Sequence, residues 1–128
     1  MGKSIHDDVL DAPLNEIADN GNKIVLCSAE PTTYAEATAT YMLVEHALTV
    51  GDGNGDYTVA NGDTSGRKLT VTQQSSISIT NSGTANHAAI VDTGNSKLLT
   101  VTTVTSQVLT SGGTVTIPAF KIEIGDPT

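Results

Sequence analysis

Residues 97–124, KLLTVTTVTSQVLTSGGTVTIPAFKIEI, decide the fold class. Their second half alternates apolar with polar side chains, and the apolar members are Val115, Ile117, Phe120, Ile122 and Ile124. A period of two is typical of a β-strand with one buried and one solvated face. The alternation slips once, at Pro118-Ala119, and Ser111-Gly112-Gly113 supplies a turn after the Val- and Thr-rich residues 99–108. The stretch therefore predicts a closing β-hairpin formed by residues 99–108 and 114–124.

Shorter runs of the same kind recur earlier in the chain. Strands are expected at residues 41–50, 57–60, 68–72, 76–80 and 87–92, separated by turn signals such as Asn54-Gly55 and Asn61-Gly62. Residues 23–28 are apolar without alternation through Ile24, Val25, Leu26 and Cys27, which indicates a strand covered on both faces. Many short strands with frequent turns predict a mainly β fold, a single-domain antiparallel β-sandwich of the jelly-roll or Ig-like type over residues 1–128.

Residues 4–21 are expected to form a helical N-terminal arm. Apolar residues recur there at helical spacing, at Ile5, Val9, Leu10, Leu14 and Ile17. Asn20-Gly21 is a helix stop. Pro13 leaves two alternatives: one kinked helix, or a second, shorter helix capped by Asp11. In both cases we expect an amphipathic helix that packs its apolar stripe on the β-sandwich.

Composition excludes several classes of function. The chain of 128 residues has a formal net charge of −8 and no Lys/Arg cluster, so we expect no nucleic-acid contact and no attraction to anionic membranes. It has neither a signal-peptide pattern nor an apolar run of about 18 residues, which predicts synthesis in the cytoplasm and no membrane span. Hydrophobic residues make 38% and aromatic residues 3%, so the core is thin and gains stability when another chain covers its edges.

One acidic loop is a partial match to a calcium-binding motif. Asp52, Asn54, Asp56 and Asp63 stand at positions that supply ligands in a twelve-residue calcium loop. Three features argue against the match: Tyr57 replaces the required glycine, Asp63 is shorter than the usual Glu, and no helix flanks the loop. The sequence therefore predicts an acidic hairpin turn and no metal or cofactor, with calcium binding as the alternative.

No catalytic residues are predicted. Cys27 with His46 or His87 and an aspartate would supply a nucleophile, a base and an orienting group. Cys27, however, lies in the most apolar run of the chain, where a thiol is a small core residue with a raised pKa. Residues 62–68 contain glycines near two cations but lack the Walker spacing of a phosphate-binding loop. We therefore expect no enzyme.

Several stretches resemble a family of small proteins encoded among the virion genes of tailed bacteriophages and prophages. The main ones are Ile5-His6-Asp7-Asp8-Val9-Leu10-Asp11-Ala12 and Cys27-Ser28-Ala29-Glu30-Pro31-Thr32-Thr33-Tyr34-Ala35-Glu36-Ala37. Further matches lie at residues 62–68, 83–88, 91–93 and 120–124, so the resemblance covers nearly the whole length. Pro13 departs from the resemblance, which leads us to expect a helix former there, and it leaves the continuity of the first helix open. The resemblance brings no catalytic residues.

The resemblance implies a structural role in a phage particle. The leading hypothesis is a capsid decoration, or cement, protein on the virion head, which forms homo-oligomers and clamps the major capsid protein. A trimer would suit the local threefold positions of an icosahedral shell. One alternative is a tail, adaptor or fibre-associated virion protein. Another, of a different class, is a carbohydrate- or calcium-binding surface module that uses the Asp52 to Asp63 loop or Tyr34, Tyr41 and Tyr57.

Overall fold

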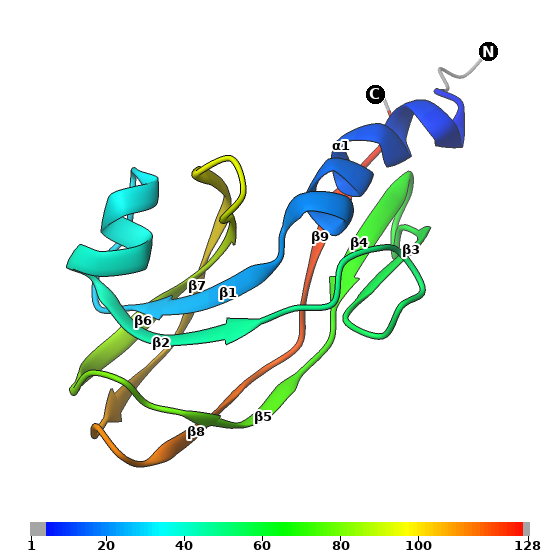
Figure 1. Ribbon diagram of the computed structural model, residues 1–128. Coiled ribbons are helices and arrows are strands. Elements are labelled where there is room, and N and C mark those ends of the chain that lie inside the picture. The colour runs from blue at the N-terminus through cyan, green and yellow to red at the C-terminus, as the bar shows by residue number, and fades with distance from the viewer. Residues whose placement is uncertain (1–4, 127–128) are drawn as a thin grey trace. The chain divides into compact units, whose positions relative to one another are not determined.

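The computed structural model describes residues 5–126 and shows a mainly β chain with antiparallel sheets and an N-terminal helix (Figure 1). The predicted fold class is thereby confirmed. The elements are, in order, α1 (Asp7–Asn20), β1 (Lys23–Cys27), the π-helix η1 (Glu36–Thr40), β2 (Met42–Ala47), β3 (Tyr57–Asn61), β4 (Arg67–Val71), β5 (Gln74–Ser78), β6 (Gly83–Asp92), β7 (Lys97–Leu109), β8 (Thr114–Ile117) and β9 (Phe120–Ile124).

The described residues group into two compact units. Unit 1 combines residues 5–20, 49–73 and 118–126, and unit 2 combines residues 21–48 and 74–117. Each unit therefore contains segments that are distant in the sequence, and the chain passes from one unit to the other four times. The single domain expected from the sequence stays a prediction.

Unit 1 packs α1 on an antiparallel sheet with the strand order β3-β4-β9. Cross-strand partners share a face, and the rows Tyr57–Val71–Phe120 and Val59–Leu69–Ile122 are the more apolar ones. The buried side chains of unit 1 are Leu10, Leu14 and Ala18 of α1 with Tyr57, Leu69 and Val71 of the sheet. Spacing of four residues along α1 places its three buried side chains on one face.

The helix differs from its prediction in extent and in its buried face. It begins at Asp7 rather than at residue 4, which lies outside the described residues, and it ends at Asn20. Pro13 lies inside this one helix, and the Asp11 carboxylate bonds Arg67 instead of capping a second helix. Val9 is 61% exposed and Ile5 is 38% exposed, so the predicted stripe is wrong at these two positions. Ala18 takes part in the buried face because it follows Leu10 and Leu14 at the same spacing.

Unit 2 contains a four-stranded sheet with the order β2-β1-β6-β7 and a two-stranded ladder of β5 and β8. The central strand β1 is buried at Ile24, Val25, Leu26 and Cys27, as its unbroken apolar run predicts. A helical segment covers one face, because Ala37 of η1 joins a buried cluster with Val25, Cys27, Ala89 and Val91. The ladder contributes the buried side chains of Ile77, Val115 and Ile117.

The predicted closing hairpin is wrong, because the strands of residues 97–124 pair with three different partners. β7 pairs with β6, β8 with β5, and β9 with β4. The expected turn is tied to another segment: the Gly112 N–H donates to the Ile79 carbonyl at 3.1 Å, and the Ile79 N–H donates to the Gly113 carbonyl at 3.0 Å. The slip at Pro118-Ala119 separates β8 from β9, which belong to different units.

Candidate protein-interaction surface

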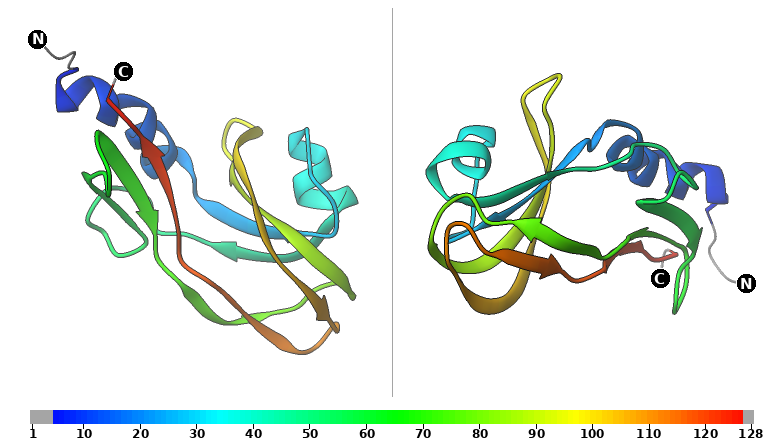
Figure 2. Two further views of the ribbon diagram at one scale, coloured as in Figure 1. Left: turned by 180° about the vertical axis from the view of Figure 1, so that it is seen from behind. Right: turned by 60° about the horizontal axis from the view of Figure 1, so that its bottom comes forward.

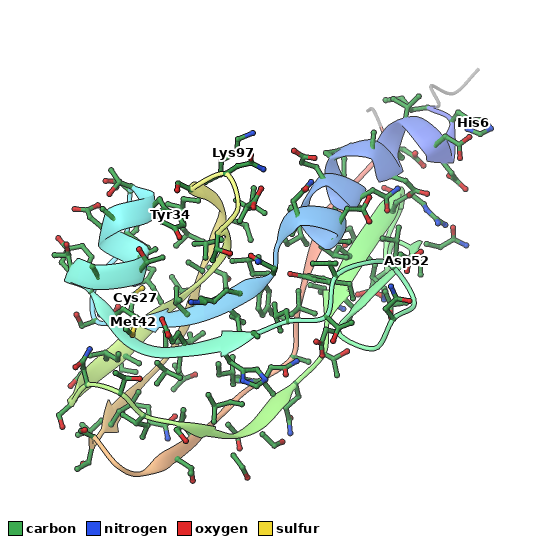
Figure 3. The ribbon with its side chains drawn as sticks, viewed as in Figure 1. His6, Cys27, Tyr34, Met42, Asp52 and Lys97 are labelled. Atoms are coloured by element: carbon green, nitrogen blue, oxygen red, sulfur yellow. The ribbon has the colours of Figure 1, made fainter. Side chains whose placement is uncertain are left out.

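The acidic loop uses its polar groups to hold its own backbone. The Asp52 carboxylate accepts the Val59 N–H at 2.8 Å, and the Asp56 carboxylate accepts the Thr49 N–H at 2.6 Å. The side-chain amide of Asn54 donates to the Val50 carbonyl at 2.8 Å. Figure 3 marks the loop at Asp52. These bonds shape a closed loop before β3, and this loop is not a hairpin turn, because the flanking strands β2 and β3 belong to different sheets.

Asp63, the fourth residue of the calcium pattern, bonds two lysines on the polar face of the unit 1 sheet. It accepts a hydrogen bond from Lys68 at 2.5 Å and another from Lys121. These bonds lower the pKa of Asp63 to about 2, so the carboxylate stays ionised at neutral pH. Within residues 5–126, no three His, Cys, Asp or Glu side chains are grouped to hold a metal ion.

The structure brings Cys27 close to one of its candidate partners. The β1–β6 register places His87 opposite Cys27, and Nδ1 of His87 lies 2.6 Å from Oδ1 of Asn86. Cys27 is nevertheless fully buried, and its thiol donates a long 3.7 Å hydrogen bond to the Ala37 carbonyl. Burial raises the pKa of the Cys27 thiol to about 11. This environment suppresses the thiolate that nucleophilic chemistry needs.

The candidate sugar-binding tyrosines are also part of the packing. Tyr57 is fully buried in unit 1, and burial raises its pKa. Tyr34 and Tyr41 pack against the buried cluster of unit 2. A hollow of about 200 Å³ in unit 1 is lined by Thr70, Ala119, Phe120 and Lys121. It is smaller than the roughly 300–1,000 Å³ that small-molecule sites span.

One long part of the chain carries almost no charge. Between Leu69 and Phe120, only Asp92 and Lys97 are formally charged at neutral pH. This part contains β5, β6, β7 and β8, whose exposed side chains are mostly Ser, Thr, Asn and Gln. Its one large exposed hydrophobic side chain is Val108, at 78% exposure. We call residues 98–118 of this part, which contain no charge, the neutral segment.

The two edges of the four-stranded sheet differ in how far they are covered. At β2, the Leu43 carbonyl accepts the N–H groups of Thr80 and Asn81, each at 3.0 Å, and the Asn81 side chain donates to the Met42 carbonyl at 2.9 Å. Glu45 adds an exposed charge to the same strand. At β7, none of the strands in the described chain pairs with the outer edge (Figure 2). β7 is thus the open edge of this sheet.

The open edge lacks most of the protection that natural edge strands carry. From Leu98 to Leu109, β7 has no charged residue and no proline. Its pairing with β6 shifts at Leu99 and again over residues 104–106, so Thr100 to Thr103 form the regular stretch between two bulges. The N–H and C=O groups on the outer side of this stretch are positioned to receive another strand.

Sequence reasoning identified residues 99–108 as a strand but missed its position at an edge. The absence of charge along the neutral segment was the available signal, since charge depletion is typical of protein contacts. Among residues 5–126, no helix is long and apolar enough to cross a bilayer. Comparisons with protein-family models, curated proteins and solved structures find no significant match for the chain.

Proposed function

We propose that this protein is a non-enzymatic structural component of a tailed-phage virion, foremost a capsid decoration protein that binds neighbouring major capsid subunits. The resemblance of its sequence stretches to virion proteins supplies the setting. The observation that carries the proposal is the neutral segment, which combines an uncharged, open β7 edge with rows of exposed Ser and Thr. Such a surface suits broad contact with protein and offers no enclosure for a substrate.

The distribution of charge supports the same function. Unit 1 carries ten acidic and three basic side chains among its described residues, whereas unit 2 carries four and two. An acidic surface keeps free subunits soluble and steers them toward basic patches on a particle. The neutral segment would then make the close contacts, where unpaired charges are costly.

Capsid binding tests the proposal directly. Purified protein is added to expanded capsids that lack it, and bound copies are counted on washed particles. We expect stoichiometric binding and greater resistance of the capsids to heat. Val108→Asp should weaken binding at least tenfold, since it adds a charge to the neutral segment. Thr58→Asp, which adds the same charge at an exposed position of β3, is the control. Wild-type protein that fails to bind would contradict the decoration role.

A tail, adaptor or fibre-associated protein is the alternative within the same class, because an open edge can also pair around a tube or spike. Electron microscopy of intact virions separates these locations. The surface-module alternative predicts heat on titration with calcium chloride or capture on a glycan array. Either result, without binding to virions, would replace the structural proposal.

A further inference from the structure

We propose that two copies of this chain pair through β7. The two strands would run antiparallel around a twofold axis and join two four-stranded sheets into one continuous sheet. This inference deepens the proposed function and rests on it, because a decoration protein is expected to form homo-oligomers. The contact itself is argued from the edge, the charge and the register of β7.

The two outer strands of the four-stranded sheet, β2 and β7, favour a symmetric contact between two copies. A sheet with two open edges could join head to tail, with β2 of one copy against β7 of the next. The β2 edge, however, already receives the N–H groups of Thr80 and Asn81 at its Leu43 carbonyl. Within this sheet β7 is therefore the edge without such contacts, and pairing it with β7 of a second copy uses the same uncharged strand on both sides. Such isologous contacts close on two copies.

The charge of the chain favours a second copy as the occupant of this edge. Each copy carries a net charge of −8, so two copies repel wherever their acidic surfaces approach. A homotypic contact must therefore lie where the chain has no charge, and the neutral segment is such a place. A basic partner would gain instead from the acidic side chains of unit 1.

The register of β7 supplies the centre of the contact. The regular stretch from Thr100 to Thr103 lies between two bulges, which interrupt pairing on both sides. Antiparallel pairing centred on this stretch directs Lys97 toward Ser106 of the second copy, so no like charges face each other. Figure 3 shows Lys97 at the tip of the β6–β7 hairpin. Since this stretch is short, we expect a weak dimer with a micromolar dissociation constant.

The test compares two lysine substitutions by sedimentation equilibrium over a range of protein concentrations. Thr103→Lys places a lysine on the open edge, which is the protection that natural edge strands use. Thr58→Lys places the same side chain at an exposed position of β3. Both changes reduce the net negative charge, so general repulsion alone predicts tighter association for both. The pairing predicts that Thr103→Lys weakens the dimer at least tenfold and that Thr58→Lys leaves it unchanged or tighter.

Hydrogen exchange provides a readout that needs no substitution. Outward-facing amides from Thr100 to Thr103 should become protected as the protein concentration rises, whereas those of β3 should not. A monomer at all concentrations, a trimer as the smallest assembly, or equal effects of the two lysines would overturn the inference. Monomers that still bind capsids would overturn the pairing alone, and dimers that bind no capsid would overturn the decoration role alone.

Discussion

Arg67 and Asp11 fasten helix α1 to strand β4 within unit 1. Nε of Arg67 donates to Oδ1 of Asp11 at 2.7 Å, and a second guanidinium nitrogen donates to Oδ2 at 3.3 Å. Both side chains are largely covered, with 18% and 17% of their surfaces exposed. The guanidinium also donates to the Asn61 side chain of β3 at 2.8 Å. One arginine thereby joins the helix to two strands of its sheet.

Removing this arginine should destabilise the docking of α1. We expect Arg67→Met to lower the melting temperature by several degrees, because it leaves the largely covered Asp11 carboxylate without its partner. Thermal unfolding followed by circular dichroism measures the change. Lys23→Met is the control, since its 3.4 Å pair with Glu45 is more exposed and contributes little. Equal losses in the two variants would show that the Arg67 pair has no special role.

The face of α1 that is buried can be tested with two truncations. Leu14 is 1% exposed, so Leu14→Ala should cost about 2–5 kcal/mol in the free energy of unfolding through lost apolar contacts and a cavity. Val9 lies on the exposed side of the same helix, so Val9→Ala should lower the free energy of unfolding by less than about 0.5 kcal/mol. Denaturant titration measures both values. A large cost at Val9 would place that side chain in a contact.

Asp63 should make the stability of the protein vary with pH in the acid range. Its pKa is about 2 in the folded protein against an ordinary value of 3.8, because Lys121 and Lys68 bond the ionised carboxylate. A lowered pKa in the folded state contributes stability that is present above the ordinary value and is lost as the pH falls through about 2. The difference in unfolding free energy between wild type and Asp63→Asn should therefore be constant above about pH 4.5 and shrink between pH 4 and 2.

A comparison variant isolates the cause of that shift. Lys121→Met removes the bond that lowers the pKa of Asp63 most. The double variant Lys121→Met, Asp63→Asn should therefore lose less unfolding free energy than the two single variants lose together. Additive effects with no dependence on pH would contradict the bonding of Asp63 by these lysines.

The Cys27 thiol should react only when unit 2 opens. Full burial and a pKa of about 11 leave little thiolate near neutral pH. We expect iodoacetamide to label the native protein very slowly at about pH 8 and the denatured protein rapidly, as mass spectrometry would report. Ile24→Ala, which weakens the same strand, should accelerate labelling by increasing the open population. Rapid labelling of native wild type would mean that the thiol is accessible.

Local patterns predicted the strands of this protein well but not their partners. Alternation at Val115 and Ile117 depends on one strand and its burial, so the sequence alone reveals it. β7 pairs with its neighbour β6, whereas β8 pairs with β5, and Ile79 bonds the Gly112-Gly113 turn; these last contacts join segments far apart in the chain, which local spacing does not reveal. The Ser111-Gly112-Gly113 turn was therefore recognisable from the sequence, but the strands on its two sides, β7 and β8, do not pair with each other.

The candidate surface was predictable in composition but not in position. The neutral segment is visible in the printed sequence, and so is the loop from Asp52 to Asp63. The spacing of residues does not reveal that β7 is an open edge, because this depends on the strand order β2-β1-β6-β7. Nor does it reveal that Lys68 and Lys121 bond Asp63, because this depends on the strand order β3-β4-β9. Val9 was expected in the buried stripe and is exposed, whereas Ala18 is buried and was not expected there, because the contacting sheet selects the buried side of a helix.

The division of each unit among distant segments has a consequence for biosynthesis. The sheet beside α1 lacks its β9 strand until Phe120 to Ile124 have left the ribosome, although the helix is translated first. Helix α1 contacts β3 and β4, so Leu10 and Leu14 stay uncovered in a nascent chain until residues 57–71 have been made, and the sheet they pack on is completed only later by β9. We expect unit 1 to fold slowly, because it must bring together three segments that are far apart in the chain.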